Sequence, residues 1–405
     1  MGARVWKTCG VVAFCAGLVA CTGGGGGGGA VVLPTAFAIK LIATKLIQPM
    51  QYKANPTTPS VAYVLERPGR LRLMVNDVLQ TTPILDLSSV IAIGSEGGLL
   101  GMAFDPNFAS NRYIFVHCTI GATYDTQIYR YTLSADMKTV VPGSQKSIIR
   151  VDQRPFDNHK GGSINFGSDG FLYLALGDGG DTNDSQNNSQ NKAKLIGKIN
   201  RIDTKTDDFP ADAANNYGIP PTNPYLGVAG VRGEIWDFGM RNPFRWSVDP
   251  SNGALLIADV GQDRFEELNY EAAGRGGRNY GWRVREGYVA SGNAGPAFGS
   301  KFNDPFFVVT HPAGEAIIGG YIYQGNAFGA LKGRYLFGDY ITNVLWSIQI
   351  TYTGGEADKL AFSKAISHTI PGGYNGLVSI DPDKNGEPIV TELNTGHIFR
   401  LVPVP

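Results

Sequence analysis

Cysteine and histidine are scarce in this 405-residue chain, which contains four cysteines and five histidines. No two of them stand at the H-x-x-x-H or C-x-x-C spacing of a dedicated zinc site. Neither a G-x-S-x-G nucleophile elbow nor a phosphate-binding P-loop is present. The sequence therefore argues against the most easily recognised zinc, hydrolase and nucleotide sites.

Charged residues are also sparse, at 17% of the chain, and the 35 basic side chains balance the 35 acidic ones. Such a balance gives no electrostatic reason to expect nucleic acid as a partner. Long amphipathic helical patterns are rare, whereas 54 glycines and many aromatic and β-branched residues are present. This composition favours an all-β protein that is rich in turns and large enough to bury its own core.

The first twenty residues have the composition of a secretory signal and are not expected to belong to the fold. Arg4 and Lys7 form a short basic region, and the apolar residues 8–20 are too few to span a bilayer. They end in LVAC, which resembles a bacterial lipobox in which Cys21 is lipidated; ordinary signal cleavage nearby is the alternative. Seven consecutive glycines follow, so residues 21–37 are predicted to be a lipidated cysteine and a flexible tether.

This leader predicts where the protein is found. We expect an exported protein, anchored by lipid in the bacterial cell envelope, at the outer membrane facing the periplasm or the cell surface. Thr22 provides no inner-membrane retention signal of the aspartate type. Membrane contact is expected only through the lipid. Because Cys21 carries that lipid, Cys118 is the only other cysteine of the mature chain and no intramolecular disulfide is possible.

A short apolar strand that ends in a polar residue, followed by a turn and a second strand, recurs six times. The copies are spaced by 50 to 83 residues and begin at Tyr63, Tyr113, Leu172, Leu255, Tyr335 and Pro388. A solenoid would need shorter and more uniform repeats, and an α/β fold would need helices between the strands. We therefore predict one six-bladed β-propeller of four-stranded antiparallel blades over residues 38–405.

Six polar residues end the first strand of the copies: Glu66, His117, Asp178, Asp259, Asp339 and Glu392. If these strands lie near the central channel, the side chains ring one end of it and could bind a cation or a polar ligand. The alternative is that turns at strand ends prefer acidic residues for structural reasons. We favour the structural interpretation for most of them and ligand binding for one or two.

Two segments contain residue types that suit catalysis or anion binding. His159 lies in DNHKGG, where a neutral imidazole could act as a base and glycines let a ligand approach the backbone. A lone histidine is nevertheless more often structural. Arg241, Asn242 and Arg245 lie in GMRNPFRWSVDP; they could bind a carboxylate or sugar oxygens, or equally pin a loop through backbone carbonyls.

The acidic turn within residues 258–282 is one candidate for calcium. Its carboxylates crowd the chain around Gly261, whose carbonyl is a further hard oxygen ligand. They belong to Asp259, Asp263, Glu266 and Glu267. A solvated acidic turn is the alternative and explains the same residues nearly as well.

Two other acidic segments are weaker candidates. Residues 381–392 match the letters of an EF-hand loop through Asp381, Asp383 and Asn385. Strands rather than helices are expected on both sides, and a proline falls inside, so a tight Asn-Gly hairpin is favoured. Residues 177–191 are polar enough to bind calcium, although a surface insertion is the simpler interpretation.

Eight longer motifs occur in one order along the chain. They are EGGLLGMAFDPNF, NHKGGSINFGSDGFLYLALGDGG, GKINRID, IWDFGMRNPFRWSVDP, DVGQDRFEELNY, GRNYGWRVREG, IIGGYIYQG and GRYLFGDY. Together they resemble the glucose/sorbosone dehydrogenase family over about residues 38–403. That family includes soluble PQQ-dependent sugar dehydrogenases and the propeller of hedgehog-interacting proteins.

The resemblance implies a sugar dehydrogenase in which PQQ lies over the propeller channel on a calcium ion. A histidine takes the proton of the sugar's anomeric hydroxyl while hydride passes to the quinone, and the motifs place this base at His159. Asn158 stands where the dehydrogenases carry Asp, and Glu96 where a cofactor-binding Gln is usual. The other carried-over positions are cofactor contacts at Arg241 and Asn242 and calcium-binding carbonyls at Gly261 and Gln262.

The chain departs from the family where the cofactor's carboxylates need cations. Ile341 and Thr342 occupy the segment of the dehydrogenase Lys, and Gly373 and Asn375 replace a pair of arginines. Three cations that could compensate are Lys160, Arg245 and Arg283.

Two hypotheses about function follow. The first is PQQ- and calcium-dependent oxidation of a sugar, with His159 as general base and a separate electron acceptor. The second is a non-catalytic propeller that binds carbohydrate or a protein partner on the same face. The missing cations favour the second, and the intact His159, RNP and DVGQ segments favour the first, which is the preferred interpretation.

Overall fold

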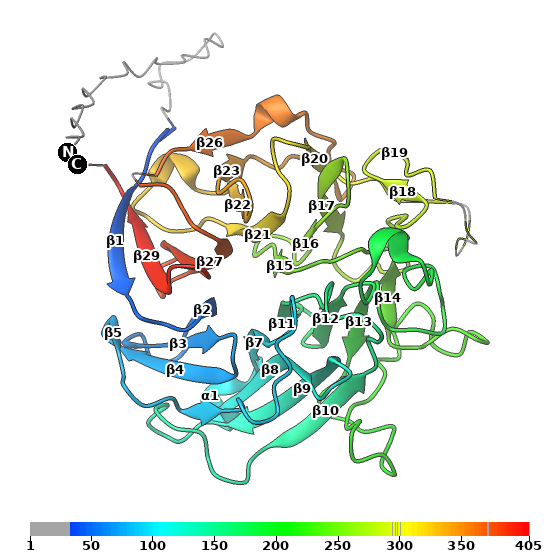
Figure 1. The fold of residues 1–405 in the computed structure, drawn as a ribbon, viewed down its shortest axis with the longest axis horizontal. Helices are drawn as coiled ribbons and strands as arrows, with labels where there is room; N and C mark the ends of the chain where they lie inside the picture. The colour runs from blue at the N-terminus through cyan, green and yellow to red at the C-terminus, as the bar shows by residue number, and fades with distance from the viewer. Residues whose placement is uncertain are drawn as a thin grey trace, which may run out of the picture.

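A computed structural model describes residues 33–404, apart from positions 294, 296, 298, 300 and 371. The predicted signal, Cys21 and the seven-glycine tract lie outside these described residues. Small antiparallel sheets surround a central axis, and the chain passes once around the ring (Figure 1). The predicted all-β, six-bladed propeller is confirmed.

Each blade has four antiparallel strands in sequence order from the axis outward. The first blade contains β2 (Pro49–Ala54), β3 (Val61–Glu66), β4 (Arg70–Val75) and β5 (Val78–Leu79), with β6 (Leu85–Asp86) also paired to β4. The second contains β7 (Leu99–Phe104), β8 (Tyr113–Ile120), β9 (Asp125–Thr132) and β10 (Lys146–Val151). The third contains β11 (Ile164–Phe166), β12 (Leu172–Leu176), β13 (Lys198–Ile202) and β14 (Ile235–Phe238).

The other three blades follow the same order, with one exception in the last. The fourth contains β15 (Arg245–Val248), β16 (Leu255–Asp259), β17 (Phe265–Glu271) and β20 (Phe307–Thr310). The fifth contains β21 (Ile317–Ile322), β22 (Tyr335–Asp339), β23 (Leu345–Ile348) and β26 (Ile366–His368). The sixth contains β27 (Leu377–Pro382), β28 (Pro388–Glu392), β29 (His397–Val402) and, as its outer strand, β1 (Ala38–Ala43).

Minor elements decorate the loops. Two short hairpins pair β18 (Arg285–Glu286) with β19 (Val289–Ala290) and β24 (Tyr352–Thr353) with β25 (Glu356–Ala357). Helical turns are limited to α1 (Phe108–Asn111) and three 3-10 segments, Thr182–Asp184, Gly329–Leu331 and Phe362–Lys364. Over the described part of the chain, none of these is long and apolar enough to cross a membrane.

The two ends of the chain close the ring. β1 pairs with β29 in antiparallel register from Ala38 opposite Val402 to Ala43 opposite Ile398 (Figure 1). The outer strand of the last blade therefore comes from the start of the chain. Hydrogen bonds inside the sixth blade thus join the two ends of the chain, and residues 44–48 connect this blade to the first.

The six sequence copies correspond to the second and third strands of the six blades. Neighbouring blades cover both faces of a second strand, so it appears in the sequence as a continuous apolar run rather than an alternating one. All five residues of β12 and of β22 are buried. The innermost and outermost strands are shorter or more mixed, which is why the repeat was visible only in the middle of each blade.

Aromatic side chains fill the space between blades. Between the fourth and fifth blades, the ring of Phe337 lies 5.6 Å from that of Phe307 and 5.4 Å from that of Trp346. All three are at most 4% exposed. Burying a side chain of this size stabilises a fold by about 1.5–3 kcal/mol, so packing between blades can hold the ring together.

The six polar strand-end residues lie one strand outside the channel, so the condition under which they would ring it is not met, and the structural interpretation favoured for most of them agrees with their contacts. The innermost strands are instead β2, β7, β11, β15, β21 and β27, which contact one another around the axis. Asp339 shows the structural role of these residues: its buried carboxylate accepts N–H bonds from Ala316 and Thr342, both at 2.7 Å. The entry loop of a blade is thereby bonded to its second strand. Similar entry-loop bonds are made by Glu66, Asp178, Asp259 and Glu392.

Candidate functional site

One end of the central channel opens into a cavity of about 230 Å³, which we call the mouth cavity. Its polar wall is formed by Arg67, Ser95, Glu96 and Asn242. The rest of its lining is apolar or aromatic: Met50, Phe244, Val260, Ala316, Ile318, Tyr340, Val378 and Leu393. A largely apolar pocket with a few converging polar groups is the usual form of a small-molecule site.

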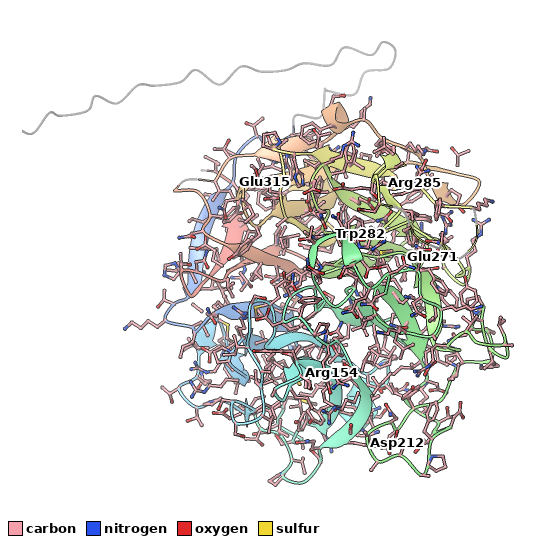
Figure 2. The ribbon with its side chains drawn as sticks, turned by 45° about the vertical axis from the view of Figure 1, so that its right-hand side comes forward. Arg154, Asp212, Glu271, Trp282, Arg285 and Glu315 are labelled. Atoms are coloured by element: carbon pink, nitrogen blue, oxygen red, sulfur yellow. The ribbon has the colours of Figure 1, made fainter. Side chains whose placement is uncertain are left out.

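His159 lies behind the polar wall and is paired with a buried carboxylate. Its Nδ1 is 2.8 Å from Oδ1 of Asp178, which also accepts the N–H of Gly180 at 2.9 Å. Oδ2 of Asp178 accepts the indole N–H of Trp282 at 2.8 Å; Figure 2 labels Trp282. A carboxylate can only accept, so Nδ1 carries the proton and Nε2 is the free acceptor. Nε2 has no hydrogen-bond partner among the residues that the structure describes. It is therefore available to take a proton.

The backbone of His159 is held in a turn that costs conformational energy. Its φ is +49°, in the left-handed region, where a residue other than glycine is strained by on the order of 1 kcal/mol. Its N–H donates to Oε2 of Glu96 at 2.8 Å, and the side-chain amide of Asn242 donates to the same oxygen at 3.0 Å. Oδ1 of Asn242 in turn accepts the N–H of Gly161 at 3.0 Å. Glu96 and Asn242, predicted to contact the cofactor, thus also fix the turn that presents His159.

Asp259 holds the loop that carries Arg241 and Asn242. Its two carboxylate oxygens accept the backbone N–H groups of these residues, at 2.9 and 2.6 Å. Burial, reinforced by Glu267, raises the pKa of Asp259 well above its usual value. The structure therefore gives this predicted metal ligand a loop-anchoring role.

The turn at Gly261 and Gln262 presents free carbonyl oxygens. Its N–H groups are occupied, since Gly261 donates to Glu266 (3.3 Å) and Gln262 donates to Oε1 of Glu286 (2.9 Å). The pKa of Glu286 lies below its usual value because several backbone N–H bonds outweigh the effect of burial. Neither carbonyl of the turn accepts a hydrogen bond from the described residues. Oxygen atoms of this kind suit a hard cation such as calcium.

The acidic side chains near this turn are directed at other partners. Glu266 lies 2.8 Å from Nε2 of His311 and accepts the N–H of Ile317 at 2.9 Å. Glu267 accepts the N–H of Gly287 at 2.6 Å, and burial raises its pKa to about 7. Across residues 33–404, leaving out the undescribed positions, no three His, Cys, Asp or Glu side chains are grouped for a metal. The structure does not bring these acids together, so a cation here would depend on the carbonyls.

Residues 381–392 form a hairpin between β27 and β28, as the Asn-Gly interpretation predicted, and the EF-hand alternative is wrong. Asp381 faces the channel end opposite the mouth cavity, where it lies 3.5 Å from Lys53. Asp383 accepts the N–H of Asn385 at 2.7 Å and pairs with Arg400 at 3.1 Å. Asp383 lies beyond the end of β27, in the turn, so its carboxylate meets the turn and Arg400 and not the partner of Asp381.

The polar insertion after β12 folds against the turn at Gln262. Asn183 exchanges hydrogen bonds with the Gln262 side chain, at 2.8 and 2.7 Å. Asp184 is fully buried and accepts backbone N–H bonds from Asn188 and Ser189. The insertion therefore borders the site, and several of its polar residues are buried and not on the surface.

Two of the compensating cations point away from the mouth cavity. Nζ of Lys160 donates to the carbonyls of Gln153 (2.9 Å) and Phe156 (2.7 Å), and burial lowers its pKa to about 8. Arg283 donates to the carbonyl of Asp184 at 2.7 Å, within the insertion. Neither residue lines the cavity.

Arg245 closes the channel beneath the mouth cavity. Its guanidinium donates to the carbonyls of Met50 (2.7 Å), Leu100 (3.1 Å) and Val378 (3.1 Å), which belong to three other blades. It lies 4.0 Å from the centre of the Phe244 ring, which lines the cavity. On the other side of Arg245 the channel opens into a second cavity of about 480 Å³. Of the two interpretations of Arg245, pinning backbone carbonyls is the one observed.

Arg241 and Asn158 border the site in different ways. Nη1 of Arg241 donates to the carbonyl of Val260 at 2.9 Å, while its buried Nε has no hydrogen-bond partner. The side chain of Asn158 lies against Gly180, where a Cβ would come within 2.1 Å of its Oδ1. Arg241 therefore keeps one unpaired but buried donor and does not line the mouth cavity, whereas Asn158 lies against Gly180.

The rim on the fifth and sixth blades carries no cation at the predicted positions. Ile341 is 51% exposed, and Thr342 bonds to Asp339. The backbone of Asn375 bonds to Glu392. Sequence reasoning missed the one basic residue that does line the cavity, Arg67, because it lies in the first blade, far along the sequence from the family's cationic positions. It also missed that Asp178 is the partner of His159, although both are in one motif.

The sequence profile of Glucose / Sorbosone dehydrogenase matches residues 48–371. The HIPL2 protein of Arabidopsis thaliana is 31% identical over 73% of this chain and 51% of its own length, and the human Hedgehog-interacting protein is 24% identical over 90% and 52%. The aldose sugar dehydrogenase YliI of Escherichia coli is 28% identical over 62% of each chain. The chain thus spans about half the length of the plant and human relatives.

Solved structures share the fold. A crystal structure of glucose dehydrogenase superposes with a TM-score of 0.72 at 24% identity, over 91% of this chain and 99% of that one. The PQQ-bound aldose sugar dehydrogenase of Streptomyces coelicolor superposes with a TM-score of 0.67 at 24% identity, over 92% and 99%. At this identity the likeness supports the propeller architecture.

Proposed function

This chain belongs to the glucose/sorbosone dehydrogenase family, and we propose that it oxidises a sugar hydroxyl with PQQ and calcium, using His159 as general base. The observation that carries the proposal is the His159–Asp178 pair beside the mouth cavity. A buried carboxylate that fixes the tautomer of a histidine is the arrangement by which proteins prepare a base. Relatives named as aldose sugar and quinoprotein glucose dehydrogenases support the reaction class.

The residues present fit such a cofactor on one side of the cavity. The unpaired carbonyls of Gly261 and Gln262 would hold calcium, and Arg241, whose Nη2 makes no hydrogen bond to the described residues, would meet a carboxylate. Glu96 and Asn242 would border the cofactor while keeping their bonds to the His159 turn. When bound, PQQ supplies a quinone that accepts a hydride equivalent from the sugar.

His159 performs the proton transfer in this proposal. Nε2 accepts the proton of the sugar hydroxyl as the adjacent carbon gives up its hydride. The imidazolium that forms is stabilised by Asp178, which lies 2.8 Å from Nδ1. Asp178 is itself fixed by Trp282 and Gly180, so the pair does not need to reorganise during the reaction. A separate acceptor then takes the electrons.

Cofactor binding and turnover test the proposal separately. A protein starting at residue 30 is mixed with PQQ and calcium, and dye reduction is followed with a panel of aldoses. We expect PQQ to bind and His159→Ala to abolish turnover without loss of binding. The matched control is His397→Ala, which changes a histidine outside the site. If wild-type protein does not bind PQQ at micromolar concentration, or if His159→Ala retains turnover, the enzyme proposal fails.

The second function is a non-catalytic propeller whose mouth binds carbohydrate or a protein partner. The apolar rim at Ile341, where the resemblance led us to expect a cation, favours it. The HIPL2 and Hedgehog-interacting names among the relatives fit the same idea. Retained sugar or protein binding in a chain that binds no PQQ would support this alternative.

We also propose that the protein is exported and anchored by lipid at Cys21 in the cell envelope. The support is the LVAC sequence and the glycine tract that follows it. Metabolic labelling with a radioactive fatty acid should mark the full-length protein and fail to mark Cys21→Ser. Equal labelling of both proteins would contradict the anchor.

A further inference from the structure

Arg67 is the only basic side chain among the residues that line the mouth cavity. It follows β3 in the first blade, whereas the resemblance led us to expect cations on the fifth and sixth. The fifth- and sixth-blade lining is apolar or aromatic, at Ala316, Ile318, Tyr340, Val378 and Leu393. The positive charge of this cavity is thus on the first blade, which adjoins the sixth, and not at the expected positions.

The guanidinium of Arg67 is held rigidly along one edge. Nε donates to the carbonyl of Gly97 at 2.8 Å, and Nη2 donates to the carbonyls of Gly94 (3.0 Å) and Ser95 (2.5 Å). Gly98 makes this possible, because a Cβ there would come within 2.6 Å of Cγ of Arg67. The side chain is therefore oriented before any ligand arrives.

The other edge of this guanidinium is unused. Nη1 of Arg67 makes no hydrogen bond to the described residues, and no carboxylate in that part of the chain lies within ion-pair distance. Burial lowers the pKa of Arg67, and Glu96, Tyr340 and Asp157 oppose this by favouring the charged form. A cation whose partners are neutral carbonyls keeps its attraction for an anion.

A second positive charge lies under the cavity floor. The guanidinium of Arg245 sits 4.0 Å from the ring centre of Phe244 and bonds only to backbone carbonyls. Glu96 is the only acidic residue among those that line the cavity. Arg67 in the wall and Arg245 beneath thus place two positive groups at this end of the channel.

We propose that Arg67 forms a carboxylate-binding subsite in the mouth cavity, with Nη1 donating to one carboxylate of the ligand. The inference rests on the proposed function, which it deepens: Arg67 would supply a charge contact that the family's Lys and Arg positions lack in this chain. The carboxylate could belong to PQQ or to an acidic sugar such as a uronate. Both sources share the chemistry that a guanidinium recognises.

Charge recognition is tested by comparing PQQ with its uncharged trimethyl ester. Fluorescence quenching gives the affinity of each for the wild type, for Arg67→Gln and for Arg67→Lys. Loss of one charge-assisted bond should weaken PQQ binding by roughly 10- to 100-fold in Arg67→Gln and leave the ester nearly unchanged. Arg67→Lys should recover part of the affinity. The control is Arg70→Gln, since Arg70 is ion-paired with Asp86 outside the cavity.

Each outcome decides the inference. Equal losses for PQQ and the ester would mean that Arg67 only supports residues 93–97, and unchanged PQQ affinity in Arg67→Gln would also overturn the proposal. If circular dichroism shows that Arg67→Gln is unfolded, Arg67→Lys is compared with the wild type in its place. A ratio of PQQ affinity to ester affinity equal to that of the wild type then overturns the subsite.

A second pair of ligands separates this inference from the proposed function. If the wild type binds neither PQQ nor the ester, the cofactor proposal fails, and calorimetry with glucuronate and glucose tests the subsite alone. Binding of glucuronate in preference to glucose, lost in Arg67→Gln, supports the subsite. Equal binding of the two sugars, or binding of neither, overturns it.

Discussion

Nδ1 of His159 lies 2.8 Å from Oδ1 of Asp178, although two strands of the third blade separate these residues in the sequence. His159 is in the loop that enters β11, and Asp178 follows β12. The antiparallel pairing of these strands brings the two ends together. Asp178 is the third-blade member of the buried strand-end residues that hold entry loops, and here the held group is a candidate base.

The tautomer of His159 should depend on Asp178. Asp178→Asn introduces an amide that can donate to Nδ1, which would move the proton to Nε2 and remove the base. We expect kcat to fall by about 10²- to 10⁴-fold with little change in PQQ affinity. Nitrogen NMR of the imidazole reports the tautomer directly. The matched control is Asp152→Asn, an exposed aspartate; normal turnover in Asp178→Asn would contradict the role.

Arg245 should be a major contributor to stability. Arg245→Met keeps much of the side-chain volume but removes the side-chain donor from buried carbonyls on three other blades. Because each unpaired buried polar group costs about 1–3 kcal/mol, the free energy of unfolding should fall by about 3 kcal/mol or more. Urea unfolding measures this loss.

Arg154→Met provides the comparison for that variant. Arg154 pairs with Asp152 on the surface, and both side chains are more than half exposed (Figure 2). Exposed ion pairs contribute about 0–1 kcal/mol, so this change should have a small effect. Similar losses in the two variants would show that Arg245 does not hold the blades together.

The buried pair of Asp237 and Glu271 should make stability depend on pH. Burial raises the pKa of Glu271 to about 7, although Arg278 opposes the shift, and burial together with Glu271 raises the pKa of Asp237 well above its usual value. The folded protein therefore keeps protons that the unfolded chain loses near pH 4.5. The two protonated carboxyl groups contribute fully to the free energy of unfolding at low pH, and this contribution is lost as the pH rises through about 7.

Asp237→Asn tests this pH dependence. Oδ2 of Asp237 is buried without a partner, while Oδ1 accepts the N–H of Arg278, so an amide can replace the carboxyl without losing that bond. The free energy of unfolding of the variant, minus that of the wild type, should increase by about 1–3 kcal/mol as the pH rises from 5 to 8. Exposed Glu315→Gln is the control (Figure 2). A difference that is constant over this pH range would contradict the assignment.

Cys118 should report global opening of the propeller. A protein starting at residue 30 has Cys118 as its only cysteine. The side chain is fully buried in β8, and burial raises the pKa of its thiol. We expect no reaction with a thiol reagent in native buffer and complete reaction in denaturant. Rapid labelling of the native protein would show that the second blade opens independently.

The blades were predictable from the sequence because their second strands are buried on both faces. A run such as LYLAL, followed by Gly and Asp, has the same physical cause in each blade and so recurs in the sequence. The innermost strands were not identified. β11 has only three residues and β15 begins with a charged Arg245, and neither has a hydrophobic pattern that distinguishes it from a loop.

The candidate base was predictable, but its surroundings were only partly so. His159, Arg241 and Asn242 were found from short motifs, and the structure links Glu96 to His159 and Asn242. Arg67 was missed because it belongs to another blade, and its entry into the mouth cavity depends on ring closure. The acidic residues considered as calcium ligands accept backbone N–H groups in the structure. A sequence shows how many carboxylates lie close together along the chain, but not which N–H groups they face.

The sequence by itself determined the number of blades, the strand pairs inside them and the turn that carries His159, because these depend on local patterns of burial and turn formation. The tertiary structure decided which side chains share the mouth cavity, which carboxylates are occupied by backbone N–H groups, and on which side the cation lies. These relationships join residues from different blades, such as Glu96 with Asn242, 146 positions apart. They arise when the ring closes and have no signature in any single segment.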